Sequence, residues 1–374
     1  MDKISKTIFG YLLLFWLAQF PLVSWAQAKS IWVKPLQQCW VFPSSNMTSL
    51  KTASDNEKTI LLPTSQGEIV GIDISKGQAI WKTKIGETFD SEIFVDGQSL
   101  LVAGSETAAA NALGSTPSPS MLSINIDSGI ASSLIPNLRL FDSEGIFIES
   151  NGGLVVIAER NGNIYAFNKA LKEVLWRKTF DLGFTTRPKL LNSRLYVGSS
   201  NRTVIVLSVI DGEMVGQIPI GKTPSDLLLS DSALYVGDQL GGVRSISLST
   251  YSEIWKTKTG GGISEIAAFE DVILVSSNDN FEYAISKKSG KKVWKRKLAG
   301  RILGKALVES RIAAMVTHGS NIGLFIDLND GAIVNRITLS KDDYFVSAPV
   351  FLSGKIVVPT NSGLIAYSPD RCSK

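Results

Sequence analysis

The sequence predicts an all-β fold: an eight-bladed β-propeller of four-stranded antiparallel blades, closed by pairing of its N- and C-terminal segments. Three observations support this prediction. A sheet-forming unit recurs eight times with a period of about 40 residues, and no long segment has the 3.6-residue apolar spacing of a helix. The last unit is incomplete, whereas an unassigned strand stands at the start of the repeat region. Four strands in about 40 residues is typical of a propeller blade.

Each unit is recognised by a small polar residue, which we call the anchor, directly after a run of apolar residues. The residue before the anchor is always large and apolar, and in five units a glycine follows four positions later. An Asp, Asn or Ser side chain can accept a hydrogen bond from the backbone of the following turn, and glycine supplies the positive φ of a tight hairpin. The anchors are Asp73, Asn125, Asn168, Ser208, Ser247, Ser286, Asp327 and Ser368.

A tryptophan follows the anchor by eight positions in four of the units. Its large surface suits packing between neighbouring sheets. The eighth unit ends before this position, and the segment 37–42 carries Trp40, which takes the place of the missing residue. This strand would complete the last blade and remove its open edge. The predicted blade-docking residues are Trp40, Trp81, Trp176, Trp255 and Trp294.

The two cysteines fall on the two sides of this predicted closure. Cys372 lies four residues after the last anchor, Ser368, and Cys39 lies beside Trp40. An even, small number of cysteines in an exported chain favours a disulfide. A Cys39–Cys372 bond would stabilise the closing blade by roughly 2–4 kcal/mol. The alternative is two unrelated buried thiols.

The first 28 residues have the three parts of a secretory signal peptide. Lys3 and Lys6 precede an apolar run over residues 8–23, and residues 26–28 form a small-x-small cleavage site. The alternative is an uncleaved membrane anchor, which the short and interrupted apolar run disfavours. We therefore predict export to the periplasm or the extracellular space.

Residues 29–374 are predicted to form a single propeller domain, with a flexible, low-complexity loop insertion at 104–120. Without the leader, the chain carries 36 basic and 33 acidic residues and has no basic block. This balance makes nucleic acid a poor candidate for the main partner. We expect a monomer that can associate peripherally with a membrane.

The sequence contains few of the residues and motifs that catalytic and metal sites need. His318 is the only histidine, so a histidine-based metal cluster is excluded. The sequence has no vicinal cysteine pair and no Cys-x-x-Cys-His haem motif. The acidic segments 279–282 and 341–344 lack the spacing of an EF-hand. We predict no catalytic residue, no metal and no cofactor.

The repeat resembles the pyrroloquinoline-quinone-type propeller repeat, in which an alternating strand ends in Ala-hydrophobic-Asp and is followed by Gly and then Trp. The segment 71–73 with Gly77 and Trp81 matches this pattern best, and the resemblance covers about residues 36–370. One branch of the family comprises quinoprotein dehydrogenases, which hold the quinone and a calcium ion over the ring's axis. The other comprises non-catalytic, BamB-type assembly factors of the outer membrane, which bind partners through loops on one face.

Length, eight units and export favour the non-catalytic branch. We therefore predict a non-enzymatic scaffold for protein–protein interactions in the cell envelope, of the kind that acts in outer-membrane protein assembly. The alternatives are a quinone-dependent oxidoreductase and a periplasmic ligand-binding or sensor propeller. Apolar and Arg residues of blade-connecting loops are candidates for the interaction surface, unless they pack between blades instead. These candidates are Phe180, Leu182, Phe184, Arg187, Tyr344 and Phe345.

Overall fold

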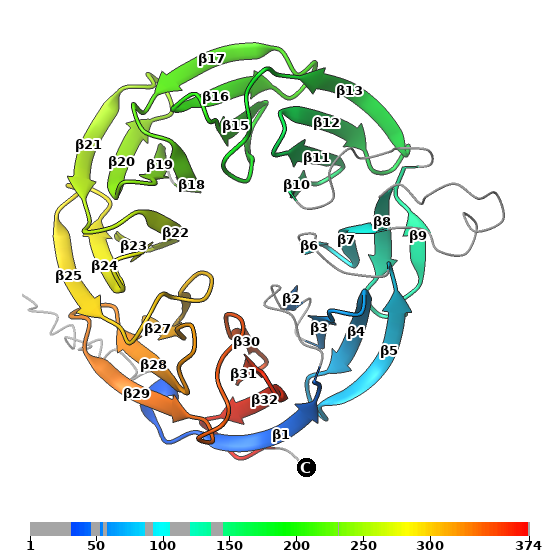
Figure 1. Ribbon diagram of the computed structural model, residues 1–374, viewed down its shortest axis with the longest axis vertical. Coiled ribbons are helices and arrows are strands. Elements are labelled where there is room, and N and C mark those ends of the chain that lie inside the picture. Colours follow the sequence, from blue (N-terminus) through cyan, green and yellow to red (C-terminus); the bar gives the residue numbers. More distant parts are fainter. Residues whose placement is uncertain are drawn as a thin grey trace, which may run out of the picture.

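The computed structural model describes residues 31–45, 53–54, 58–86, 93–104, 120–135, 145–230 and 232–372. Eight four-stranded sheets surround a common axis, and every pairing between neighbouring strands is antiparallel (Figure 1). The predicted fold class is thus confirmed. The predicted signal peptide, residues 1–28, lies outside the described residues, as does all but the two ends of the predicted insertion at 104–120.

We number the blades 1 to 8 along the chain, from the innermost strand of each outward. Blade 1 is β2(Ala53–Ser54), β3(Thr59–Pro63), β4(Glu68–Asp73) and β5(Gln78–Lys84). Blade 2 is β6(Ile93–Asp96), β7(Ser99–Gly104), β8(Ser120–Asn125) and β9(Ala131–Ser133). Blade 3 is β10(Ile146–Asn151), β11(Leu154–Glu159), β12(Asn163–Asn168) and β13(Glu173–Thr179). Blade 4 is β14(Lys189–Leu191), β15(Arg194–Gly198), β16(Thr203–Ser208) and β17(Met214–Pro219).

The second half of the ring continues this order, except at its last blade. Blade 5 is β18(Pro224–Ser230), β19(Ala233–Asp238), β20(Gly242–Ser247) and β21(Glu253–Lys258). Blade 6 is β22(Ile263–Phe269), β23(Val272–Ser277), β24(Phe281–Ser286) and β25(Lys292–Lys297). Blade 7 is β26(Leu307–Glu309), β27(Ile312–Met315), β28(Ile322–Asp327) and β29(Ile333–Thr338). Blade 8 is β30(Val350–Leu352), β31(Lys355–Thr360), β32(Gly363–Ser368) and, as its outermost strand, β1(Gln37–Pro43).

The pattern of buried and exposed residues in each strand depends on the position of the strand within its blade. The two middle strands are covered on both faces by neighbouring blades, and β23, for example, is buried at every position. The outermost strands alternate instead, because one face meets the next blade and the other meets solvent. On β25 the lysines are mostly exposed, whereas Trp294 is only 8 % exposed. The hydrophobic core is therefore divided among the blade junctions and not gathered at the centre.

The anchor turn has the geometry that the repeat predicts. In blade 1 the Asp73 carboxylate accepts hydrogen bonds from the backbone N–H groups of Ser75 and Lys76, at 2.7 and 3.0 Å. The N–H of Gly77 donates to the Asp73 carbonyl at 2.8 Å. The five repeat glycines, of which Gly77 is the first, have φ between 65° and 72°. This left-handed conformation favours glycine, since a Cβ atom would strain it.

The same glycines receive the tryptophans of the preceding blades. A Cβ atom built on any of the five would lie 2.4–2.8 Å from an indole atom, so only glycine fits beneath the ring. Each indole Nε1–H also donates to a carbonyl of the next blade, which satisfies its one polar group. These bonds are Trp40 to Ile74 at 2.8 Å, Trp81 to Ile126 at 2.7 Å, Trp176 to Val209 at 2.7 Å, Trp255 to Lys287 at 2.7 Å and Trp294 to Leu328 at 2.8 Å.

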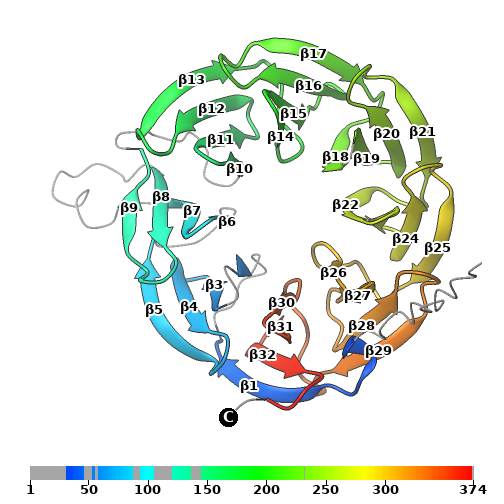
Figure 2. The same cartoon turned by 180° about the vertical axis from the view of Figure 1, so that it is seen from behind.

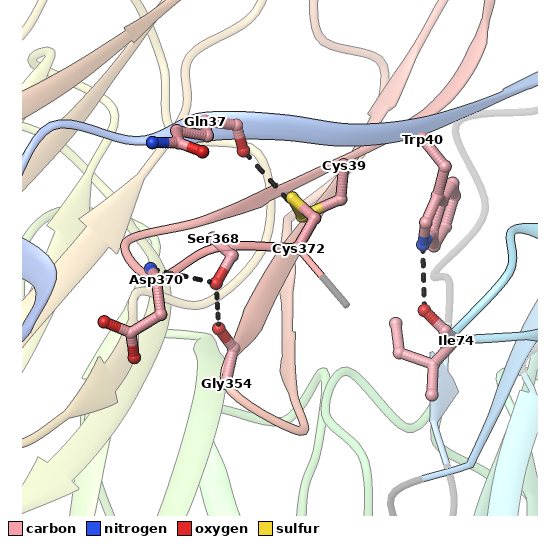
Figure 3. Close-up of a disulfide and its surroundings, with 8 residues drawn as sticks. All are labelled: Gln37, Cys39, Trp40, Ile74, Gly354, Ser368, Asp370 and Cys372. Atoms are coloured by element: carbon pink, nitrogen blue, oxygen red, sulfur yellow. Dashed lines mark hydrogen bonds between the residues drawn. A yellow bond between two sulfur atoms is a disulfide. The ribbon is translucent and has the colours of Figure 1, made fainter. Parts of the chain in front are cut away.

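Blade 8 is built from both ends of the repeat region. Strand β1 pairs with β32 from Gln37 opposite Ser368 to Pro43 opposite Gly363, with a bulge before Trp40. At this bulge Cys39 forms a disulfide with Cys372, which lies four residues beyond the end of β32, and their Cα atoms are 5.3 Å apart (Figure 3). Trp40 points away from the disulfide and docks on blade 1 (Figure 3). The ring is therefore closed by hydrogen bonds, a covalent bond and an indole at one seam.

A short segment before β1 closes a second junction, which the sequence analysis did not predict. The 3₁₀ turn η1(Ile31–Val33) places Trp32, which is fully buried, against Phe325 of blade 7 and Phe351 of blade 8. Its indole N–H donates to the Glu309 carboxylate at 2.9 Å. Asn335, eight residues after the blade 7 anchor, donates to the Trp32 carbonyl at 2.8 Å. Trp32 thus fills one of the junctions at which the repeat lacks its tryptophan.

Candidate functional site: the axial cavities and the connecting loops

The loop between β13 and β14 contains the first group of predicted interaction residues. Phe184 is only 2 % exposed and packs into the junction of blades 3 and 4, with its backbone paired to Ser199. It is therefore not available to a partner, and the alternative of interblade packing holds for this residue. Phe180 and Leu182 are half-buried against the same core, with the Phe180 ring 6.0 Å from that of Phe184.

The loop between β29 and β30 divides its two aromatic residues in the same way. Phe345 is 1 % exposed, pairs with Thr360 and belongs to the core around Trp32, so its prediction as a surface residue is also corrected. In these two loops the buried ring closes one end of a blade junction, where an unfilled space would lose packing contacts. Tyr344 is 44 % exposed and remains available at the surface.

Arg187, the sixth candidate, lies at the centre of the ring instead of on a loop surface. It lines a polar cavity of about 150 Å³ to which five consecutive blades, 3 to 7, contribute. Figure 2 shows the innermost strands of these blades, β10, β14, β18, β22 and β26, facing the axis. The cavity is lined by Phe147, Arg160, Thr185, Thr186, Arg187, Lys189, Ser225, Asp226, Ser264, Glu265 and Lys305.

Charged side chains of both signs lie around this cavity. Lys189 lies 3.2 Å from the Glu149 carboxylate, and Lys305 lies 3.7 Å from that of Glu265. The Asp226 carboxylate accepts a hydrogen bond from the Ile266 N–H at 2.7 Å. Such groups are costly to bury unless they are paired.

Burial shifts the pKa of these groups toward their neutral forms. It raises the pKa of Asp226 and of Glu149, and the cations opposite them counteract the shift only in part. It lowers the pKa of Lys189 and of Arg187, although Glu149 and Glu265, respectively, favour the charged forms. The arrangement creates a desolvated region in which an entering charged group would interact strongly.

A second, more apolar cavity of about 490 Å³ adjoins the first at Arg187 and Lys305, which line both. Blade 4 contributes Arg187, and blades 7 and 8 contribute the remainder, so the cavity reaches across the axis. Its other lining residues are Gly304, Leu307, Val308, Ser347, Ala348, Pro349, Val350 and Phe351. Polar and apolar surfaces thus meet at two cationic side chains.

Of these charged residues only Arg187 was predicted from the sequence, although the repeat contains a signal for the others. Glu149 and Lys189 each precede the anchor of their blade by 19 positions, and Asp226 and Glu265 precede theirs by 21. Charges in register on successive innermost strands must face the same axis. Aligning the weakly patterned first strands to the anchors would have revealed this cluster.

The residues considered for chemistry lie apart from these cavities. His318 is exposed in a turn, where its backbone N–H donates to the Arg301 carbonyl at 2.9 Å. Within the described ranges, no group of three or more His, Cys, Asp and Glu side chains is arranged to hold a metal ion. No helix among the described residues is long and apolar enough to span a membrane.

Comparisons with known proteins point to one family. The family model described as outer membrane protein assembly factor BamB matches residues 137–257 and 239–371. The outer membrane protein assembly factor BamB of Yersinia pestis is 21 % identical in an alignment of 336 residues that covers 80 % of this chain and 79 % of that protein. Among solved structures, the computationally designed Ika8 protein matches with a TM-score of 0.73 and 11 % identity. BamB from Moraxella catarrhalis matches with a TM-score of 0.67 and 12 % identity, and both matches cover 89 % of this chain and 99 % of the other.

Proposed function

Because this chain belongs to the family described as outer membrane protein assembly factor BamB, we propose that it is a non-enzymatic scaffold in outer-membrane protein assembly. The observation that carries this proposal is the match of the family model to two long, overlapping segments of the ring, residues 137–257 and 239–371. A closed ring suits a scaffold, because its connecting loops are held at fixed positions by rigid blades.

The proposed place of action is the cell envelope, with export to the periplasm and a monomeric ring that associates peripherally with the membrane. The Cys39–Cys372 disulfide supports export, since such bonds persist in oxidising compartments and are rare in the cytosol. The partners are other envelope proteins, and nucleic acid is not among them.

The proposed docking surface consists of Phe180, Leu182 and Tyr344. All three lie on loops that join the outermost strand of one blade to the innermost strand of the next, so they share one face of the ring. Phe180 and Leu182 rest on a packed core, and Tyr344 is 44 % exposed. Aromatic residues held in place before binding lose little entropy when a partner covers them.

The experiment is crosslinking in the native cells, followed by purification from membranes and identification of the captured proteins. We expect outer-membrane assembly components, with reduced recovery for a Phe180→Ser, Tyr344→Ser double variant. Leu171→Ser is the matched control, because Leu171 is 64 % exposed in an anchor turn at the outer edge of blade 3. Repeated absence of assembly components from the wild-type sample would refute the proposal. So would dye reduction by the purified protein after addition of pyrroloquinoline quinone and calcium, since turnover would identify an oxidoreductase.

A further inference from the structure

We propose that the two axial cavities together bind a ligand in which an apolar group ends in a carboxylate. The polar cavity and the apolar cavity meet at Arg187 and Lys305, which line both of them. A carboxylate at this junction would contact the two cations, and the attached apolar group would extend into the larger cavity. Two sources share this chemistry, a free fatty acid and the C-terminal residue of a peptide.

The charges around the polar cavity favour an anion. Four cationic residues line it, namely Arg160, Arg187, Lys189 and Lys305. Three carboxylates face them: Asp226 and Glu265 line the cavity, and Glu149 pairs with Lys189. Among the described residues, the cluster therefore has one positive charge in excess, which a single carboxylate would balance. A partly buried cation gains most from such a partner, because water screens the attraction least there.

The junction of the cavities also offers hydrogen-bond donors. The Lys305 ammonium lies 3.7 Å from Glu265, which is longer than a good charge-assisted hydrogen bond and leaves donors for a second partner. A guanidinium such as that of Arg187 can hold a carboxylate by two parallel hydrogen bonds. The Thr185 hydroxyl, which lines the polar cavity, has no hydrogen-bond partner within the described structure.

The size and lining of the larger cavity indicate which kind of group is attached to the carboxylate. Its volume of about 490 Å³ lies within the range of small-molecule sites. The walls opposite Arg187 come from β26 and β30 and the residues before them, including Leu307, Val350 and Phe351. Phe351 is held from behind by Trp32, with ring centroids 4.7 Å apart, so this wall is already in place before a ligand enters. A linear or aromatic apolar group fits such a wall better than a sugar or a nucleotide, whose hydroxyl groups would lack partners.

Calorimetric titration of the purified protein tests the proposal with two matched pairs of probes. Octanoate is compared with octanamide, and N-acetyl-Leu-Phe with a free carboxylate is compared with its C-terminal amide. We expect saturable binding of at least one acid and binding of its amide weaker by roughly tenfold or more, since a hydrogen-bonded ion pair is lost. Tighter binding of octanoate identifies the fatty acid as the source, and tighter binding of the peptide acid identifies a peptide C-terminus.

Variants then locate the site. Arg187→Gln and Lys305→Gln should each weaken binding of the acid by roughly tenfold. The exposed residues Arg336 and Lys222 provide matched controls, and Arg336→Gln and Lys222→Gln should bind as the wild type does. In the wild-type protein, a photoreactive octanoate analogue should label β26 and β30, as mapped by mass spectrometry. This measurement requires no substitution and remains informative if an axial variant fails to fold.

Three results would overturn the inference: no saturable binding of either acid, equal binding of acid and amide, or labelling confined to the outer strands. These outcomes do not bear on the scaffold proposal, because the titration uses the isolated protein. Conversely, failure to capture assembly components would leave binding of the acid in place. The two proposals can therefore fail separately.

Discussion

Two neighbouring junctions of the ring achieve the same packing with opposite partners. Between blades 5 and 6, Trp255 on β21 covers Gly290, whose φ is 69°. Between blades 4 and 5 the position of the tryptophan is occupied by Gly216, and the position of the turn glycine by Tyr251. Tyr251 has a φ of 57°, and a Cβ on Gly216 would lie 3.3 Å from its ring. At this junction the large side chain comes from the turn of blade 5 and the glycine from the outer strand of blade 4. The repeat therefore preserves the total side-chain volume at the junction and not the residue type at each position.

The largest expected effect comes from emptying the tryptophan junction. Trp255 is 8 % exposed and donates a hydrogen bond to the Lys287 carbonyl at 2.7 Å. Trp255→Ala should lower the free energy of unfolding by about 3–5 kcal/mol, because it leaves a cavity and an unpaired carbonyl. Tyr251→Ala should cost less, since Tyr251 is half-buried. Urea unfolding of both variants measures the difference, and equal losses would contradict the comparison.

The junction of blades 6 and 7 contains a fully buried carboxyl group. Glu282 is fully buried at a position where five other blades have Ile or Val or Leu. Those residues are Ile69, Ile164, Val204, Val243 and Leu364. Burial raises the pKa of Glu282 to about 8, and the Ser276 hydroxyl on the neighbouring strand opposes the shift without cancelling it. The group therefore stays protonated near neutral pH.

This pKa predicts how stability depends on pH. Below the unfolded pKa, near 4.5, the group is protonated in both states. As the pH rises toward about 8, the unfolded chain releases the proton while the folded protein retains it. Stability should fall over this window by something on the order of a few kcal/mol. Thermal unfolding at several pH values should show this fall in the wild type and in the exposed control Glu173→Gln. It should be smaller in Glu282→Gln, and identical profiles would refute the assignment.

The closing seam is the one junction with a covalent bond. The disulfide of Cys39 and Cys372 links residues 333 positions apart, so its loss frees nearly the whole chain in the unfolded state. The double variant Cys39→Ser, Cys372→Ser should lose roughly 2–4 kcal/mol. Urea unfolding with and without dithiothreitol checks this, because the reductant should destabilise the wild type and leave the double variant unchanged. A reductant effect of equal size on both would point to another cause.

The smallest effect tests the exchange of volumes directly. Gly216→Trp should destabilise the protein by about 1–3 kcal/mol, because the new indole overlaps Tyr251. Adding Tyr251→Gly should recover most of the loss by restoring the arrangement of blades 5 and 6. The second substitution also relieves backbone strain, because residue 251 has a positive φ that glycine adopts more readily than tyrosine. A double-mutant cycle measures this coupling, and additive losses would mean that the two positions do not exchange volume.

The parts of the fold that the sequence predicted are those in which a local conformation demands a residue type. Gly77 and its equivalents are required by a positive φ and by the indole above them, and they recur wherever both demands hold. The closure of blade 8 was predictable because the eighth unit ends before its tryptophan position and Trp40 stands on an unassigned strand. The two cysteines lie on the two segments that this closure brings together. Trp32 was not predictable, because its place depends on a junction where Asn335 has replaced the repeat residue.

The candidate site was harder to predict than the fold. The innermost strands are short, and β14 and β26 have three residues each, so they carry little pattern of their own. The charges of Glu149 and Lys189 become meaningful only when the blades are placed around an axis. Phe184 and Phe345 show the opposite error, since an aromatic residue in a loop has the same sequence signature whether it covers a junction or meets a partner.

The position of β1 also has a consequence for how the ring forms. Among the described strands, the outermost strand of blade 8 is translated first and its partner β32 last. During synthesis β1 has no strand to pair with, and seven blades can fold while the ring is still open. We therefore expect closure to be a late step, and long-range pairings of this kind are slow to form. Until closure occurs, the nascent chain exposes two sheet edges to which other strands, or a chaperone, can bind.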